Sequence, residues 1–333
     1  MASRRQALKR RQALAGLMLL TPPLFMSTPA GAADWPERTI RMIVPFVAGA
    51  GADTVGRTFA EELAKSLGQP VVVDNKGGAG GLIGTAEGAR ALADGYTLLL
   101  TSQGTTVFNM GLYKAPGYDP LKDLTPVAVT GFLPNVLVVA PTNPATTVAE
   151  LVAQARAKPS ELTYGSSGIG SSLHMSGVTL EQRTGVKLQH VPYRGAPAAV
   201  LAVMNGEVTM GFFNTPTVLG QIKAGKLKAL AVTSQARATQ LPDLPTLIEA
   251  GIPDFVVAGW LGYAVPANTP APVVTRLNAE INRIGQIPAV KEKLLIQGFE
   301  VLPPTSPADA RKLIVDDQAI WLPLIKQSGV QPE

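Results

Sequence analysis

Short apolar runs alternate with amphipathic segments from residue 39 onward. The run Ile40–Val44 is apolar except for Arg41, as in a buried strand. Residues 54–67 place apolar side chains four positions apart, as on one face of a helix. Gly68 can end that helix. The same patterns predict strands at 71–73 and 96–100 and a helix at 84–93. This alternation predicts βαβ units, and hence α/β lobes whose mainly parallel sheets are flanked by helices.

A second series of elements begins near residue 135. Its predicted strands are 136–139, 162–164, 188–190, 209–212, 227–232 and 257–265, and its predicted helices are 147–157, 172–183, 196–204 and 215–224, with tail helices at 272–285, 289–297 and 307–327. Two chain crossings, near 133–135 and 256–260, would form a hinge between two lobes. We therefore predict a first lobe of residues 33–134 and 257–333 and a second lobe of residues 135–256. A single large sheet without a hinge is the alternative.

Residues 1–32 have the composition of a secretory signal peptide. They contain five basic residues and no acid, then an apolar run at 13–20 and the small-x-small site Ala30–Gly31–Ala32. We expect export to the periplasm by the Sec or the twin-arginine route, with a retained anchor as the alternative. Without these five, the chain has 24 basic and 24 acidic residues, so its formal charge is balanced. The balance gives no support for nucleic-acid binding.

The sequence lacks cysteine and shows no recognisable catalytic or metal-binding motif. The chain has no cysteine, which excludes disulfides, thiolate metal sites and cysteine nucleophiles. Its two histidines, His174 and His190, belong to no metal or hydrolase motif. We predict that His190 is structural, whereas His174 has either a ligand-side or loop-bracing role or a structural one. The chain is thus predicted not to be an enzyme and to use no metal or cofactor, with an extracytoplasmic hydrolase or lyase as the alternative.

Four loops rich in Gly, Ser and Thr follow predicted strands. They span residues 45–53, 75–81, 101–105 and 165–172. Ligands of parallel sheets bind beyond the carboxyl ends of the strands, where small residues and helix N-termini expose backbone N–H groups to an anion. Asp53 is placed to cap the helix that follows the first loop. Tight strand-to-helix turns without a ligand are the alternative for each loop taken alone.

Sequence motifs spread over the chain from about Trp35 to Glu333 carry a family resemblance. They are residues 40–46, 68–75, 78–81, 94–99, 118–123, 135–139, 190–195, 223–233 and 241–246. These motifs resemble the Bug family, the TctC-like solute receptors of tripartite tricarboxylate transporters. The resemblance implies a periplasmic, two-lobed Venus-flytrap protein that binds a small organic carboxylate. We expect a monomer that serves membrane transporter subunits or, as the alternative, a ligand-sensing co-receptor for a membrane signalling protein.

The resemblance also implies a set of ligand-binding residues. By position these are Phe46, Gly49, Ala50, Ala52, Asp53, Gly78, Ala79, Ser102, Thr105, Ser166, Gly168 and His174. Relatives commonly carry an acidic residue where this chain has Phe213. We therefore expect Phe213 to offer an apolar face to the ligand, which disfavours amino acids, with a core position as the alternative. Arg57, Lys76 and Arg194 could add attraction for an anion or be solvated surface charges.

Overall fold

The computed structural model describes residues 35–327. The predicted signal peptide and its cleavage site lie outside the described residues. Within them, no helix is both long enough and apolar enough to cross a bilayer.

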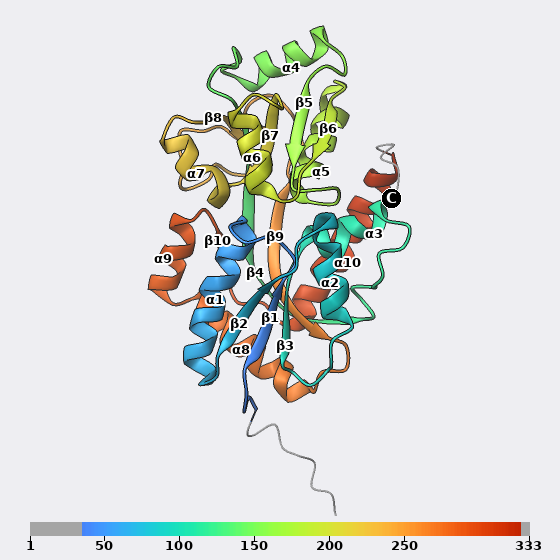
Figure 1. The fold of residues 1–333 in the computed structure, drawn as a ribbon, viewed down its shortest axis with the longest axis vertical. Coiled ribbons are helices and arrows are strands. Elements are labelled where there is room, and N and C mark those ends of the chain that lie inside the picture. Colours follow the sequence, from blue (N-terminus) through green and yellow to red (C-terminus); the bar gives the residue numbers. More distant parts are fainter. Residues whose placement is uncertain (1–34, 328–333) are drawn as a thin grey trace, which may run out of the picture. The chain divides into compact units, whose positions relative to one another are not determined.

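The first lobe is built around three parallel strands. β1 (Ile40–Val44) lies between β2 (Val71–Asn75) and β3 (Thr97–Ser102) and pairs in parallel with both. Because β1 lies between the other two strands (Figure 1), its four apolar residues are all buried, and only Arg41 is partly exposed. The connecting helices are α1 (Gly51–Leu67) and α2 (Leu82–Ala89), and α1 ends at Gly68 as predicted, with that residue in the left-handed conformation.

Two long strands connect the lobes. β4 (Leu124–Val139) and β9 (Ala258–Pro266) pair side by side in antiparallel orientation. From Asn135 onward, β4 pairs with second-lobe strands, β7 (Met210–Asn214) and β8 (Lys228–Val232). The sheet order is β2-β1-β3-β9-β4-β7-β5-β6. The sheet is therefore mixed. The strands β2, β1 and β3 at one end and β7, β5 and β6 at the other pair in parallel, whereas β4 and β9 run antiparallel to their neighbours.

The first half of β4 was not expected to be a strand. Pro126, Gly131 and Pro134 interrupt its apolar pattern, and proline normally weakens a strand prediction. The pairing with β9 shifts register between Pro126 and Ala128 and again near Gly131. These irregularities accommodate the interruptions, so β4 continues through all 16 residues.

The second lobe repeats the arrangement of the first. β5 (Thr163–Ser166) pairs in parallel with β6 (Gln189–Pro192) and with β7. Its helices are α4 (Val148–Ala157), α5 (Ser172–Thr184), α6 (Ala196–Met204) and α7 (Thr215–Lys223). An apolar cluster within this lobe joins α6 and α7 to one face of β4 and β7.

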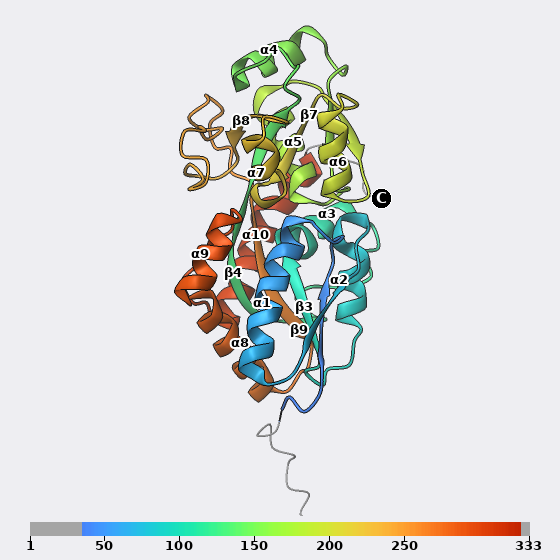
Figure 2. The ribbon, with the colours of Figure 1, turned by 60° about the vertical axis from the view of Figure 1, so that its left-hand side comes forward.

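The C-terminal helices lie beside elements of the first lobe (Figure 2). α8 (Ala271–Gly285), α9 (Pro288–Ile296) and α10 (Pro307–Gln327) pack beside β4 and the short strand β10 (Glu300–Val301). Of these helices, α8 and α9 contact α1. α10 also contacts a π-helical turn, η2 (Gly104–Phe108), and the short α3 (Asn109–Leu112). One apolar cluster runs through both lobes, from Phe108 to Phe212, and includes Ile314 and Ile325 of α10. The predicted lobe boundaries stay a prediction.

Candidate ligand-binding site

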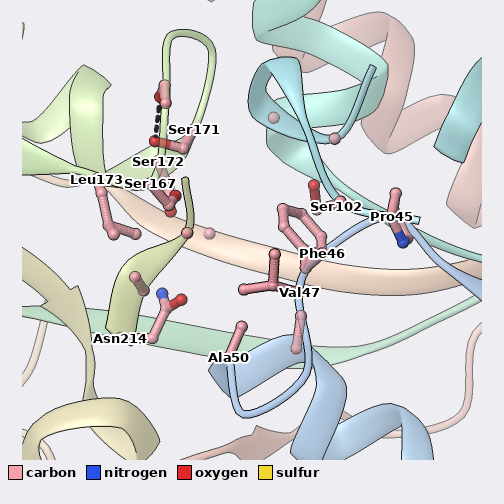
Figure 3. A pocket seen from close by; sticks show the side chains of 18 of the residues that line it. Pro45, Phe46, Val47, Ala50, Ser102, Ser167, Ser171, Ser172, Leu173 and Asn214 are labelled. Carbon is pink, nitrogen blue, oxygen red and sulfur yellow. Dashed lines mark hydrogen bonds between the residues drawn. The ribbon is translucent and has the colours of Figure 1, made fainter. Parts of the chain in front are cut away.

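A cavity of about 550 Å³ lies where the four predicted loops meet. Figure 3 shows Phe46 and Ser102 of the first lobe on one side and Ser172 and Leu173 of the second lobe on the other. The four loops line it with Pro45, Phe46, Val47, Ala50, Ala52, Gly77, Gly78, Ala79, Gly81, Ser102, Gln103, Gly104, Ser167, Gly168, Ile169, Ser171 and Ser172. Of the residues expected to bind ligand, Phe46, Ala50, Ala52, Gly78, Ala79, Ser102 and Gly168 thus border the cavity.

Further lining residues come from outside the four loops and, apart from Arg194, were not expected to meet a ligand. They are Tyr113, Leu133, Leu173, Pro192, Tyr193, Arg194, Gly195, Ala196, Asn214, Gly259, Trp260 and Leu261. The turn after β6 and the end of β7 obey the same strand-end rule as the four loops, which could have identified them. Leu133 and residues 259–261 lie on the connecting strands. Only the path of the folded chain brings them to the cavity.

Asp53 braces the first loop from behind. Its carboxylate accepts hydrogen bonds from the backbone N–H of Gly49 at 2.9 Å, from Asn75 Nδ2 at 2.8 Å and from Arg57 Nε at 3.1 Å. Burial acts to raise the pKa of Asp53, but these hydrogen bonds outweigh it and hold the pKa below its ordinary value. Neither Asp53 nor Gly49 lines the cavity. The N-cap of α1 is Ala50 and not Asp53, which instead reaches back to Gly49 from the first helical turn.

The glycines of the second loop allow close backbone packing. Gly81 adopts a φ of +91°, and a Cβ there would lie 2.7 Å from Thr105 Cγ2 and 3.2 Å from the carbonyl oxygen of Pro45. A side chain at this position would therefore be strained and would collide with the first and third loops. The chain can then turn into the short helical segment η1 (Ala79–Gly81) at the cavity wall.

The third loop is held by two sets of hydrogen bonds. Ser102 and Thr105 exchange bonds, since the Ser102 N–H donates to Thr105 Oγ1 at 3.0 Å and the Thr105 N–H to Ser102 Oγ at 3.2 Å. Thr105 is fully buried and does not line the cavity. Behind the wall, Asp317 Oδ2 accepts from Gln103 Nε2 and from Trp260 Nε1, both at 2.8 Å. Burial raises the pKa of Asp317, partly offset by these bonds.

The fourth loop rests on a buried aromatic and imidazole cluster. His174 Nδ1 accepts the Gly170 N–H at 3.4 Å, and its ring centroid lies 4.2 Å from that of His190. Burial, with a smaller contribution from His190, lowers the pKa of His174 to about 3, and burial lowers the pKa of His190 to about 4. Both rings are therefore neutral near pH 7. Neither histidine lines the cavity, so His174 lies where it braces the loop.

Ser166 and His190 form a hydrogen-bonded pair of the residue types found in serine hydrolases. Ser166 Oγ and His190 Nε2 lie 2.6 Å apart. Ser166 is fully buried, does not line the cavity, and its Oγ also accepts the N–H of Gly168 at 3.1 Å. The hydroxyl is thus used to shape the loop, and it has no access to a substrate.

Phe213 lies in the second-lobe core, in place of the ligand-facing position expected from the sequence. Its side chain is fully buried and packs in the cluster that contains Val136, Val138 and Val218. Side chains alternate along β7, so the next residue, Asn214, reaches the cavity instead. Phe213 therefore cannot touch a ligand in this structure.

The cavity lining carries no acidic side chain and one basic side chain. Arg194 is the single charged residue among the lining residues, and it forms no ion pair within residues 35–327. Arg57 is paired with Asp53, and Lys76 lies 3.7 Å from Asp74, so both are engaged elsewhere. No group of three or more potential metal ligands is present among the described residues.

Four helices begin at the cavity wall. Lining residues stand at or beside the first residues of α1, α5, α6 and α7, namely Ala50, Ser171, Gly195 and Asn214. The first N–H groups of a helix have no partner within it, and the helix dipole places partial positive charge there. These four ends and Arg194 suit an anion.

Comparison with known proteins agrees with this picture. The profile of the family described as "Tripartite tricarboxylate transporter family receptor" matches residues 55–330. Protein BugT of Bordetella pertussis is 37% identical over 320 residues, which cover 96% of this chain and 97% of BugT.

Three solved structures share the fold at comparable identity. A protein of R. palustris solved with adipate has a TM-score of 0.87 and 35% identity, over 90% of this chain and 100% of that one. The periplasmic binding protein BugD has a TM-score of 0.85 and 36% identity, over 90% and 100%. MatC from Rhodopseudomonas palustris, solved with bound malate, has a TM-score of 0.83 and 31% identity, over 87% and 100%.

Proposed function

Because this chain belongs to the tripartite tricarboxylate transporter receptor family, whose members are periplasmic solute-binding proteins and not enzymes, we propose that it captures a small organic carboxylate for uptake. One observation carries the proposal. Four helix N-termini and Arg194 border a cavity that has no Asp or Glu in its lining. A carboxylate is attracted to these groups and meets no acidic side chain in the lining.

The lining also disfavours amino acids. An α-ammonium group is costly to take out of water without an acidic partner, and no carboxylate lines this cavity. Phe213 lies in the core and does not contribute to this preference. The relatives solved with adipate and with malate support a carboxylate as the ligand here.

Both lobes are needed for useful affinity. Micromolar binding corresponds to about −8 kcal/mol, whereas a hydrogen bond to a charged group contributes about 1.5–3 kcal/mol and association costs at least about 4 kcal/mol. Three or four donors from one lobe would barely suffice. We therefore propose that residues 33–134 with 257–333, and residues 135–256, close on the ligand about β4 and β9, and that membrane transporter subunits read the closed form.

The setting proposed for this activity is the periplasm, with the protein working as a monomer after removal of residues 1–32. Deleting the gene should then abolish uptake of the ligand. Normal uptake with loss of a transcriptional response to the ligand would favour the sensing alternative.

Calorimetry on the chain from Ala33, unfolded and refolded to remove carried-over ligand, tests the function. The panel contains adipate, malate, benzoate, aspartate and glutamate. We expect micromolar binding of at least one of the first three and none of the amino acids. Failure of every carboxylate would refute the proposed function, while tight aspartate or glutamate binding would refute the exclusion of amino acids.

A further inference from the structure

The second-lobe segment Gly168–Gly170 lies against first-lobe backbone at one edge of the cavity. A Cβ at Gly104 would lie 2.8 Å from the carbonyl oxygen of Gly170. A Cβ at Gly80 would overlap the carbonyl oxygen of Ile169. Tyr113 Oη donates to that same Ile169 oxygen at 3.2 Å. The two lobes are thus in direct contact here, with no room for a side chain between them.

Gly104 differs from the other glycines at this contact. Gly80, Gly168 and Gly170 have positive φ, so a side chain would strain them regardless of the opposite lobe. Gly104 starts the helical turn η2 and has no positive φ. Within its own lobe, a Cβ there would meet only Ser102 Oγ, at an ordinary 3.4 Å. The Gly170 carbonyl of the opposite lobe is therefore what excludes a side chain at position 104.

A similar contact lies beside another wall of the cavity. Gly51, in the first turn of α1, also has no positive φ. A Cβ there would lie 3.2 Å from Asn214 Cβ and 3.4 Å from Pro216 Cγ, both of the second lobe. A side chain at Gly51 would therefore cause a smaller steric conflict than one at Gly104, because the distances are longer and side-chain atoms can shift more easily than a backbone carbonyl.

We propose that Gly104 and Gly51 are positioning residues for ligand capture, because the absence of a side chain at these two helical positions lets the lobes approach closely enough to share one ligand. The inference rests on the proposed two-lobe capture. Gly104 itself lines the cavity, and Gly170 is adjacent to the lining residue Ile169. A methyl group at 104 would hold the Gly170 carbonyl back and lengthen contacts from one lobe to a ligand bound by the other.

The variant Gly104→Ala tests this directly. We expect the dissociation constant for the tightest ligand among adipate, malate and benzoate to rise about tenfold or more. The melting temperature of the ligand-free protein should stay unchanged or rise, because alanine favours helix over glycine. X-ray scattering should show less compaction on ligand addition than in the wild type. Gly51→Ala should show the same changes to a smaller extent.

Two glycines provide matched controls. Gly220 lies within α7, with nothing within 4 Å of an added Cβ. Gly88 lies within α2, where the nearest atoms to an added Cβ belong to Leu99 of its own lobe, at 3.0 Å. Gly220→Ala and Gly88→Ala should keep wild-type affinity, although Gly88→Ala can lose stability.

The outcomes separate this inference from the proposed function. Wild-type affinity and compaction in Gly104→Ala would overturn the inference while leaving carboxylate capture intact. An affinity loss matched by an early melting transition without ligand would overturn it too. If the wild type itself binds no carboxylate, the proposed function fails first.

Discussion

Ser166 Oγ and His190 Nε2 lie 2.6 Å apart, and this bond ties the end of β5, where the fourth loop begins, to the neighbouring strand β6. His174 adds a second tie, through the N–H of Gly170. Both histidines are held neutral by burial. The loop that supplies Gly168 and Ile169 to the cavity therefore depends on two imidazoles that would be protonated at mildly acidic pH if they were exposed to water.

Acidification should therefore destabilise the protein below neutral pH. The pKa of His174 is lowered to about 3 and that of His190 to about 4, whereas an unfolded histidine titrates near pH 6.5. Above about pH 6.5 neither state gains protons, and stability is full. As the pH falls from about 6.5 toward about 4, the unfolded state binds protons that the native state does not, so each histidine lowers the free energy of unfolding by up to about 1.4 kcal/mol per pH unit.

Urea unfolding at several pH values checks this. The variant His190→Gln keeps a polar partner for Ser166 but cannot titrate, so its stability should fall less steeply between pH 6.5 and 4 than that of the wild type. Identical pH profiles for the two proteins would contradict the prediction.

Replacing Arg194 by glutamine should weaken carboxylate binding by about fivefold, and more at low salt, because an exposed charge contributes modestly and is screened. Calorimetry at two salt concentrations measures the effect. Lys226→Gln removes an exposed second-lobe charge that does not line the cavity and should leave affinity unchanged. Equal effects of the two substitutions would mean that Arg194 acts only through net charge.

Asp317→Ala should destabilise the protein by about 1–3 kcal/mol, because Gln103 Nε2 and Trp260 Nε1 would lose their shared acceptor. Ligand affinity should fall as well, since both donors belong to cavity-lining residues. Denaturant unfolding and calorimetry measure the two effects. Asp316→Ala on the same helix removes only an exposed ion pair with Lys312 and should cost less than about 0.5 kcal/mol. Equal costs for the two variants would argue against the proposed role of Asp317.

Phe213→Leu should lower stability by about 1–2 kcal/mol through lost core packing, yet leave the order of ligand affinities unchanged. Thermal melting and the same calorimetric panel measure the two effects. A change in preference between carboxylates and amino acids would show that Phe213 reaches the ligand after all.

Local signals in the sequence were enough to predict most of the elements and part of the site. β1, the end of α1 at Gly68 and the three C-terminal helices follow from apolar spacing and from glycine's freedom at a helix end. The four loops that line the cavity follow from the rule that ligands meet parallel strands at their carboxyl ends. These features depend on neighbours within a few residues, so the order of amino acids determines them.

Tertiary structure alone decided which side chains of those loops face the cavity. Asp53, Thr105, Ser166 and His174 looked available for a ligand, but each is used to brace a loop. Asp53 and Ser166 bond to Asn75 and His190, which come from distant segments. Thr105 and His174 bond to Ser102 and Gly170 of their own loops, and the fold buries them away from the cavity. The face that Phe213 presents and the extent of β4 through Pro126 and Pro134 likewise depend on pairing between distant strands. The close approach of Gly104 to Gly170 depends on contact between the two lobes, so it cannot be predicted from the residues around either glycine.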